Sequence, residues 1–291
     1  MKVYITGSHG MVGSRFLELL PKDFIPLSPE IDRLDITDKA SVDSFFEREK
    51  PNIVVHFAAY TNVGKGEKER NDKNGSCWKI NVEGSKNLAE ASKKFGLHLI
   101  HVSTDYVFSG MAGDPGPYEE SHLPEKNAEK LTWYGFTKAE AEREISKILG
   151  NNLTIIRLIY PVRAKFEGKL DYIRKPLSLF DEGKLYPMFT DQQVSITYID
   201  EACQAISKIT EGGVYGVFHA STSDITTPHE LMNYVIEKTR GVRDAVKTSS
   251  LEDNQVRYPK YGGLRVEETE KRLGIKFSSW KRVVDALAAS W

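Results

Sequence analysis

Val3-Tyr4-Ile5-Thr6-Gly7-Ser8-His9-Gly10-Met11-Val12-Gly13 begins two residues into the chain and carries its strongest structural signal. The first four residues form an apolar run typical of a buried β-strand, and an apolar pattern of helical period runs from Val12 to Leu20. Three glycines with the spacing GxxGxxG separate the two, and glycine allows a turn too tight for residues with side chains. A strand, a glycine turn and a helix in this order favour a parallel α/β sheet.

Strand-like and helix-like patterns alternate from this point as far as residue 160. Repeated alternation with nearly continuous apolar strands predicts a Rossmann-type, doubly wound parallel α/β sheet with helices on both faces. Strands are expected at 24–27, 53–57, 97–102 and 153–158, with a short one ending at Asp35-Ile36, and helices at 37–49, 78–95 and 134–149.

The rhythm breaks beyond Tyr160, where shorter and less regular elements follow. Residues 1–160 are therefore expected to form the large sheet domain, to which residues 190–220 return, and residues 161–291 a smaller, interleaved mixed α/β region. Thr227-Pro228-His229-Glu230 is a helix start, with Thr as the cap and Pro at the first helical position. Further helices are expected at 171–182, 199–210, 267–273 and from about 279, and short strands at 194–197 and 214–219.

Charge and composition argue against several classes of protein. Forty Lys and Arg against forty-one Asp and Glu leave a net charge of -1, whereas nucleic-acid binders normally carry a basic excess. No run approaches the roughly 20 apolar residues of a membrane helix. Cys77 and Cys203 form no CxxC pattern and favour free thiols, so the cytoplasm is the expected compartment. His56, His98 and His101 lack partners at ligand spacing, so no metal site is expected.

The glycine turn indicates a dinucleotide site. A pyrophosphate needs exposed backbone N–H groups, a turn without side chains and the positive end of a helix dipole. The spacing differs by one residue from the GxGxxG pattern of such sites, so a purely structural turn is the alternative. The residues predicted to lie along the cofactor here are Gly7, His9, Gly10, Met11, Val12 and Gly13.

Asp35 and Ile36 are candidates for the adenine end of the same cofactor. A carboxylate at a strand end can accept a hydrogen bond from the adenine amino group while Ile36 packs on the ring. In the alternative, Asp35 and Asp38 are a turn residue and a helix cap. An NAD ribose is held by an acid at the end of the second strand. Glu30 and Asp32 follow that end slightly too late, so NADPH is slightly favoured over NADH.

A set of catalytic candidates lies in the middle of the chain. Ser103-Thr104-Asp105-Tyr106 ends a central strand, and Tyr134 and Lys138 share one face of the next long helix because they are four residues apart. A nearby ammonium lowers a tyrosine pKa from about 10 toward the working range. Thr104 can then hydrogen-bond the oxygen that Tyr134 protonates. A packed Tyr with a solvated Lys is the alternative, but the strand-end Ser-Thr-Asp and the glycine turn favour catalysis.

In order and spacing these residues resemble the extended short-chain dehydrogenase/reductases, and within them most closely the dTDP-4-dehydrorhamnose reductases. The Ser-Thr-Asp-Tyr-Val-Phe run at 103–108 is the most specific match, and the resemblance covers nearly the whole chain. It also rests on Leu34-Asp35-Ile36-Thr37-Asp38, Ala58-Ala59-Tyr60-Thr61, Asn81-Val82, Pro117-Tyr118-Glu119-Glu120 and Asp191-Gln192.

The resemblance implies a reductase that transfers a hydride from NADPH or NADH to the C4 ketone of a nucleotide-linked 4-keto-6-deoxy sugar. It implies that Thr104, Tyr134 and Lys138 are the catalytic residues. Further cofactor contacts are implied for Ala58, Ala59, Tyr60, Ser103, Tyr134 and Lys138, and substrate contacts for Thr104, Asp105, Tyr106, Val107 and Tyr134. The nucleotide sugar is the expected partner, and a helix-mediated homodimer is compatible with the sequence.

Three departures from this family leave the exact sugar open. Residues 158–163, Leu-Ile-Tyr-Pro-Val-Arg, follow Arg157 where these reductases typically read Thr-Ser-Trp-Val-Tyr-Gly, so their tryptophan is absent. Tyr258-Pro259 replaces Arg-Pro, with Arg257 just before it, and the loop 63–77 is expanded.

Two other functions are open at this point. A nucleotide-sugar epimerase or dehydratase of the same superfamily would keep its nicotinamide and return the hydride. A dehydratase usually has an acid pair after the strand-end Thr, whereas here Tyr106 follows Thr104-Asp105. A non-catalytic NADP-binding regulatory subunit is the second, because a fold and even its site can outlast catalysis.

Overall fold

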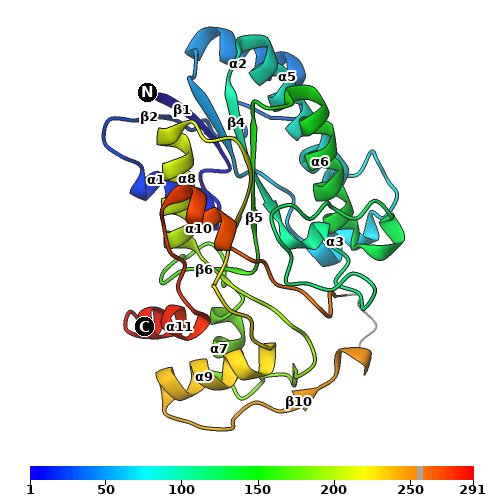
Figure 1. The fold of residues 1–291 in the computed structure, drawn as a ribbon, viewed down its shortest axis with the longest axis vertical. Helices are drawn as coiled ribbons and strands as arrows, with labels where there is room; N and C mark the ends of the chain where they lie inside the picture. The colour runs from blue at the N-terminus through cyan, green and yellow to red at the C-terminus, as the bar shows by residue number, and fades with distance from the viewer. Residues whose placement is uncertain (254–257) are drawn as a thin grey trace. The chain divides into compact units, whose positions relative to one another are not determined.

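The computed structural model describes residues 1–253 and 258–291, so Arg257 lies outside the described residues. The chain forms two compact units, each discontinuous in sequence (Figure 1). The first unit contains Met1–Val107, Leu123–Arg157 and Cys203–Phe218, and the second contains Phe108–His122, Leu158–Ala202 and His219–Trp291.

The first unit is built around a six-stranded sheet. Its strand order is β2 (Ile25–Leu27), β1 (Lys2–Thr6), β3 (Ile53–His56), β4 (His98–Thr104), β5 (Leu153–Leu158) and β9 (Gly216–Ala220). β1 pairs in parallel with β2 and β3, and β3 pairs in parallel with β4. The chain moves outward from β1 in both directions, which creates a topological switch point at the carboxyl ends of β1 and β3. The predicted doubly wound α/β class is confirmed.

Helices lie on both sides of this sheet (Figure 1). One side carries α2 (Lys39–Glu49), α5 (Ser85–Phe95) and α6 (Trp133–Leu149), and the other α1 (Met11–Leu19) and α8 (Ile199–Gly212). Two short helices and a π-helical segment precede α5: α3 (Val63–Lys68), α4 (Ser76–Trp78) and Lys79–Gly84. Single π-helical turns inside helices are frequent at functional sites.

The core of the first unit follows from strand register. Tyr4, Val54 and Leu99 occupy matching positions on β1, β3 and β4, and all three are buried on one face. They belong to one apolar cluster with Phe46 of α2 and Ile145 of α6. Each such side chain contributes about 1.5–3 kcal/mol on burial, so the α2, α5 and α6 layer is held firmly on this face.

Two expectations for the first unit need correction. The short strand predicted to end at Asp35-Ile36 is not formed, because Asp35 Oδ1 accepts hydrogen bonds from the Thr37 backbone N–H and hydroxyl, both at 2.8 Å, and bends the chain. The following helix begins at Lys39 rather than at Thr37, because Asp38 accepts from the N–H groups of residues 40 and 41 as its N-cap. Asp35 and Asp38 thus have the turn and cap geometry considered as the alternative.

The second unit has two small two-stranded sheets and its own apolar core. The sheets pair β6 (Pro161–Val162) with β8 (Thr197–Tyr198) and β7 (Met188–Phe189) with β10 (Thr248–Ser249). The helices are α7 (Arg174–Asp181), α9 (Pro228–Arg240), α10 (Glu267–Leu273) and α11 (Trp280–Ala288). Thr227 caps α9 with Pro228 in its first turn, as predicted. The strand predicted at 194–197 is shorter and shifted, since Val194 forms only an isolated bridge with Thr226.

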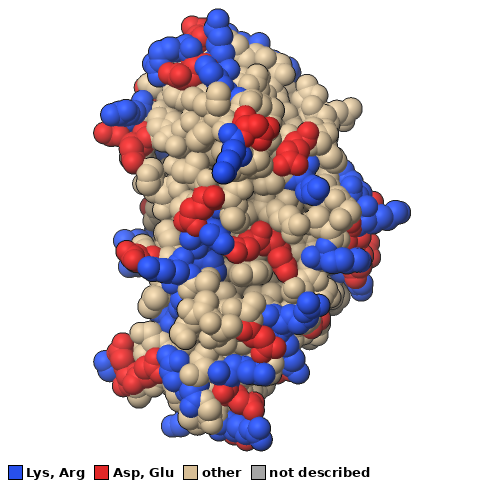
Figure 2. All heavy atoms as spheres, turned by 90° about the vertical axis from the view of Figure 1, so that its left-hand side faces the viewer, with Lys and Arg blue, Asp and Glu red and all other residues tan. Residues whose placement is uncertain are grey.

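Charges of both signs are mixed on the surface shown in Figure 2, where no single-sign area dominates. Ion pairs between exposed side chains include Lys39–Glu90 and Arg240–Asp181. Among the described residues, no helix combines the length and the apolar character needed to cross a membrane.

Candidate active site

The glycine turn has the tight geometry that its sequence predicts. Gly7 has φ 66°, and a Cβ atom on it would lie 2.6 Å from Ala58 N. A Cβ atom on Gly13 would lie 2.3 Å from the Gly7 carbonyl oxygen. α1 begins directly after Gly10, which provides no side-chain cap. The positive end of the α1 dipole therefore lies at a turn without side chains, which favours an anion such as a pyrophosphate.

Substitution of Gly13 by Ala is expected to weaken binding of NAD(P)H about 10-fold or more. The added methyl group cannot lie 2.3 Å from a carbonyl oxygen, so the turn must shift at a cost of roughly 1–3 kcal/mol. Isothermal titration with NADPH and NADH measures the effect. Gly64→Ala in α3 is the control, because its Cβ atom would lie 3.9 Å from the nearest atom. Equal affinities for Gly13→Ala and wild type would contradict the role of the turn.

The remaining predicted cofactor residues surround this turn in the first unit. His9 is exposed, and its Nε2 lies 3.0 Å from Glu30 Oε1. Ile36 is buried in the apolar core, whereas Asp35 is exposed. Two hydrogen bonds fix the backbone after β3. The Ala58 N–H donates to Thr6 Oγ1, and the Tyr60 N–H donates to Asn81 Oδ1. Met11, Val12, Ala58, Ala59 and Tyr60 are partly exposed, and Ser103 is buried with no partner for its hydroxyl among the described residues.

α6 begins directly against the turn that follows β4. A Cβ atom on Gly135 would lie 2.2 Å from the Tyr106 carbonyl oxygen, so only glycine permits this approach. Thr132 caps α6 by accepting from the Gly135 N–H. As a result the Tyr134 ring lies 5.8 Å from the Tyr106 ring, and the Tyr134 and Thr104 hydroxyls form a hydrogen bond. Three segments that are distant in sequence thus meet at one point.

The expanded loop at 63–77 is folded against the start of α6. The Trp133 N–H donates to Glu67 Oε2 at 2.8 Å, and Arg70 donates to the carbonyl oxygens of Ala128 and Leu131 at 3.2 and 2.8 Å. These contacts hold the turn that carries Tyr134. The insertion therefore supports the site from the side of α3.

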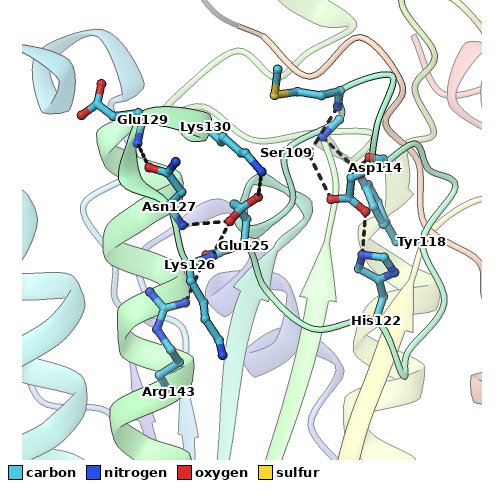
Figure 3. Close-up of polar contacts among 12 residues, drawn as sticks. Ser109, Asp114, Tyr118, His122, Glu125, Lys126, Asn127, Glu129, Lys130 and Arg143 are labelled. Carbon is cyan, nitrogen blue, oxygen red and sulfur yellow. Dashed lines mark hydrogen bonds and ion pairs between the residues drawn. The ribbon is translucent and has the colours of Figure 1, made fainter.

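The segment that leads into α6 is held by polar contacts of its own (Figure 3). Glu125 Oε1 accepts from the N–H groups of residues 126 and 127, and Lys130 pairs with Glu125 Oε2 at 3.0 Å. The Glu125 carbonyl oxygen accepts from Arg143 Nη1 at 3.1 Å. Arg143 lies on α6, so this segment is tied to the helix that it precedes.

Lys138 is buried, which rules out the solvated lysine of the alternative interpretation. Its ammonium donates to His101 Nε2 at 3.0 Å and to the Val102 carbonyl oxygen at 2.9 Å. Burial lowers the pKa of Lys138 to about 8, opposed by the negative charge of Glu142. At neutral pH the side chain is therefore mainly an ammonium.

The predicted lowering of the Tyr134 pKa by Lys138 is wrong for this structure. Burial raises the pKa of Tyr134 above its ordinary value, and the hydrogen bond with Thr104 offsets only part of this effect. The physical reason is that desolvation of the phenolate dominates while the Lys138 ammonium donates to His101 and Val102. Tyr134 is consequently a protonated phenol at neutral pH, which suits a proton donor.

Asp105 is the second acid of the site. Its carboxyl group is buried beside Thr104, whose hydroxyl donates to Asp105 Oδ1 at 3.1 Å. Burial raises the pKa of Asp105 to about 7, against the hydrogen bonds that favour the charged form. Asp105 therefore exchanges a proton near neutral pH. Tyr106 and Val107, the other predicted substrate residues, are buried in the 3₁₀ turn that follows β4.

Three residues of the site were given no role in it from the sequence. Asn81, in the π-helical segment, accepts from the Tyr60 N–H at 2.8 Å and donates to Thr137 Oγ1 at 2.9 Å, which ties α6 to the end of β3. His101 holds Lys138, and Glu142 lies one turn beyond Lys138. His101 could have been recognised from its position two residues before Ser103. Residues two apart on a strand share one face of the sheet, so His101 is expected on the same face as Ser103.

Other chemistry-bearing clusters fail on geometry. In the second unit, Asp114 Oδ2 accepts from Ser109 Oγ at 3.0 Å, and Asp114 Oδ1 lies 2.9 Å from His122 Nε2 (Figure 3). A hydrolytic triad needs the His between Ser and Asp, whereas here the Asp lies between. Among the described residues, no group of three or more His, Cys, Asp or Glu is arranged to hold a metal ion.

This chain is similar to known proteins in both sequence and overall fold. A dTDP-4-dehydrorhamnose reductase of Aggregatibacter actinomycetemcomitans is 26% identical, over 99% of this chain and 98% of that protein. A dTDP-4-keto-6-deoxy-D-glucose reductase of Streptomyces niveus is 29% identical, over 78% of this chain and 75% of that protein. The crystal structure of dTDP-4-dehydrorhamnose reductase from Bacillus anthracis in complex with NADP is 26% identical and superposes with a TM-score of 0.85, covering 100% and 98% of the two chains.

The resemblance inferred from the motifs is thereby confirmed, and it extends to the segments that depart from the usual pattern. The family model described as RmlD substrate binding domain matches residues 1–290. The match leaves out only the last residue, so it covers both units. The chain therefore belongs to the RmlD substrate binding domain family.

Proposed function

We propose that this protein is an NAD(P)H-dependent reductase that converts the C4 ketone of a dTDP-linked 4-keto-6-deoxy sugar to an alcohol. The observation that supports the proposal is that α6 places two of its side chains against the end of β4: Tyr134 interacts with Thr104, and buried Lys138 donates to the Val102 carbonyl oxygen. In open α/β sheets this edge is where ligands bind. Relatives that match 99% and 78% of this chain are named dTDP-4-dehydrorhamnose reductase and dTDP-4-keto-6-deoxy-D-glucose reductase.

The residues present fit a nicotinamide dinucleotide. The turn at Gly7–Gly13 leaves no room for a Cβ atom at either end and exposes the start of α1 to a pyrophosphate. The bound cofactor supplies the hydride. Farther along the cofactor, the proposed contacts are Ser103 and the Ala58–Tyr60 segment. The buried Ser103 hydroxyl lacks a partner among the described residues, and the segment is partly exposed.

Each catalytic residue has a distinct task. Tyr134, which burial keeps protonated, gives its proton to the carbonyl oxygen as the carbon is reduced. Thr104 hydrogen-bonds the same oxygen and orients it. The Lys138 ammonium, one helical turn beyond Tyr134, supplies a positive charge on the cofactor side of the site, where it is held by the end of β4. Because the pKa of Lys138 is about 8, turnover should fall as the pH rises through that value.

The test is NAD(P)H oxidation with purified protein and an enzymatically generated dTDP-4-keto-6-deoxy sugar. Steady multiple-turnover oxidation is the expected result. A retained cofactor with no net oxidation, but with an altered sugar, would instead identify an epimerase or dehydratase. Cofactor binding without any change in a panel of keto-sugar nucleotides would identify a regulatory subunit.

The cofactor preference rests on the segment after β2. Glu30 follows that strand too late in sequence to act as the usual ribose-binding acid, which favours NADPH. Its carboxylate nevertheless reaches His9 in the glycine turn, 3.0 Å away, where a negative charge disfavours a 2′-phosphate. NADPH and NADH should therefore be compared in the same assay, with kcat/KM as the measure of preference.

The compartment and assembly belong to the same proposal. Both cysteines are free and buried, which is usual for a protein of the cytoplasm. A homodimer formed through surface helices is tested by light scattering of the purified protein.

A further inference from the structure

The ammonium of Lys138 has a side-chain partner that the reduction mechanism above does not use. Lys138 lies on α6 and His101 on β4, 37 residues apart, and their Nζ and Nε2 atoms are 3.0 Å apart. Lys138 is 2% exposed and His101 is 0% exposed. A buried ammonium needs hydrogen-bond acceptors, and the Val102 carbonyl oxygen at 2.9 Å supplies only one of them.

His101 belongs to a polar row across three strands. Thr6, His56 and His101 are register partners on β1, β3 and β4. Each lies two residues after an apolar residue of the core cluster, namely Tyr4, Val54 or Leu99. Side chains two residues apart on a strand point to the same face, so all three polar side chains face the α5 and α6 layer. The row therefore forms the polar end of an otherwise apolar face, directly under Lys138.

The hydrogen bonds of His56 keep it neutral. The Ser85 hydroxyl donates to the Asn81 carbonyl oxygen at 2.6 Å, so Ser85 Oγ accepts from His56 Nε2–H at 3.1 Å. The other ring nitrogen, Nδ1, then accepts from the Thr6 hydroxyl at 2.7 Å. Burial, together with the charge of Lys138, lowers the pKa of His56 to about 3. No positive charge on His56 competes with the ammonium.

His101 takes the opposite tautomer. Because the Lys138 ammonium donates to Nε2, the single ring proton of neutral His101 lies on Nδ1. Burial and the charge of Lys138 hold the pKa of His101 well below its usual range. Its ring centroid lies 5.1 Å from that of His56. His101 thus presents a lone pair to the Lys138 ammonium at neutral pH.

The opposite side of Lys138 is acidic but already engaged. Glu142, one helical turn further along α6, raises the pKa of Lys138. Its two carboxylate oxygens accept from Arg157 Nε at 3.0 Å and Nη2 at 2.7 Å. Glu142 therefore acts on Lys138 through its charge, and the direction of the ammonium is set by its hydrogen bonds to β4.

We propose that His101 is a positioning residue that holds the Lys138 side chain in its catalytic direction by accepting one ammonium proton. The inference rests on the proposed reductase function for its kinetic consequence, but not for its structural one. Removal of the acceptor leaves the buried ammonium short of a partner, so the charged form becomes less stable. The alkaline limit of activity, where Lys138 loses its proton, then moves to lower pH.

The experiment compares three variants of two histidines on β4. His101→Leu removes the acceptor, and His101→Gln restores an acceptor near the position of Nε2. His98→Leu is the matched control, because His98 is also buried on β4 and hydrogen-bonded through Nε2, to Thr154 Oγ1 at 2.8 Å, but does not contact Lys138. For each protein, kcat and KM are measured as a function of pH, and the Lys138 titration is followed by NMR of ¹³C-labelled lysine.

In His101→Leu, kcat at pH 8 is expected to fall about 10–100-fold with little change in KM, and the Lys138 titration is expected at lower pH than in wild type. His101→Gln should return both toward wild type, and His98→Leu should leave both unchanged. An unaltered Lys138 titration in His101→Leu, or an equal shift in His98→Leu, would overturn the proposal.

Two readouts do not depend on activity, and the first of them needs no variant. Nitrogen NMR of wild-type His101 should show the proton on Nδ1, and a proton on Nε2 would overturn the proposal by itself. The lysine titration is measured without substrate. If the reductase assay fails while both NMR results hold, the proposed function is wrong and the His101–Lys138 contact stands.

Discussion

Tyr134→Phe should lower kcat roughly 10²–10⁴-fold while leaving NAD(P)H affinity nearly unchanged. The phenyl ring keeps the contact with Tyr106, at 5.8 Å between ring centroids, so the start of α6 is not disturbed. Only the hydroxyl is lost, and with it both the proton donor and the hydrogen bond with Thr104. Steady-state kinetics and isothermal titration of the cofactor measure the two effects separately.

The control for this variant is Tyr4→Phe. Tyr4 is a buried tyrosine of β1, and its pKa is likewise raised by burial. It lies in the apolar core with Phe45 and Phe46. Its variant should keep wild-type kcat. Turnover of Tyr134→Phe near that of wild type would rule out Tyr134 as the proton donor, whatever the substrate.

Glu142→Gln should destabilise the protein by about 3–5 kcal/mol. Glu142 and Arg157 form a bidentate pair between α6 and β5, and their side chains are only 3% and 2% exposed. The amide removes the negative charge and leaves a buried guanidinium without its carboxylate. Urea unfolding followed by circular dichroism measures the loss, and the same variant should also lower the pKa of Lys138, because Glu142 raises it.

A surface pair provides the comparison. Glu90 lies 2.6 Å from Lys39, with side chains 41% and 52% exposed, so water screens the interaction. Glu90→Gln should therefore change stability by no more than about 1 kcal/mol. Similar losses in the two variants would mean that the buried pair contributes no more than an exposed one.

Local patterns in the sequence were sufficient for the parts of the site that lie within one turn or one helix. The spacing of Gly7 and Gly13 predicted the tight turn, since a Cβ atom at either position would collide with backbone a few residues away or on the next strand. The four-residue spacing of Tyr134 and Lys138 predicted a shared helix face. Caps at Thr132 and Thr227 were readable for the same reason, because a cap is decided by residues three apart.

The same local chemistry also produced an error. Asp35 lies after an apolar residue and was interpreted as a strand end, but its carboxylate bonds to Thr37 and forms a turn. A strand at the sheet edge needs a partner strand and a suitable length, and neither is visible in a stretch of two residues. The pKa of Tyr134 was misjudged in direction because it depends on how deeply the ring is buried, which no spacing reveals.

The sequence by itself determined the doubly wound fold, the glycine turn and the shared helix face of Tyr134 and Lys138, because each depends on periodicity or on contacts between near neighbours. Only the tertiary structure decided that Lys138 is buried, that it donates to His101 and that Glu142 is paired with Arg157. Those contacts join residues 15 to 37 positions apart. They exist because strand register and the packing of α6 on the sheet bring the groups together, and neither is encoded in any single segment.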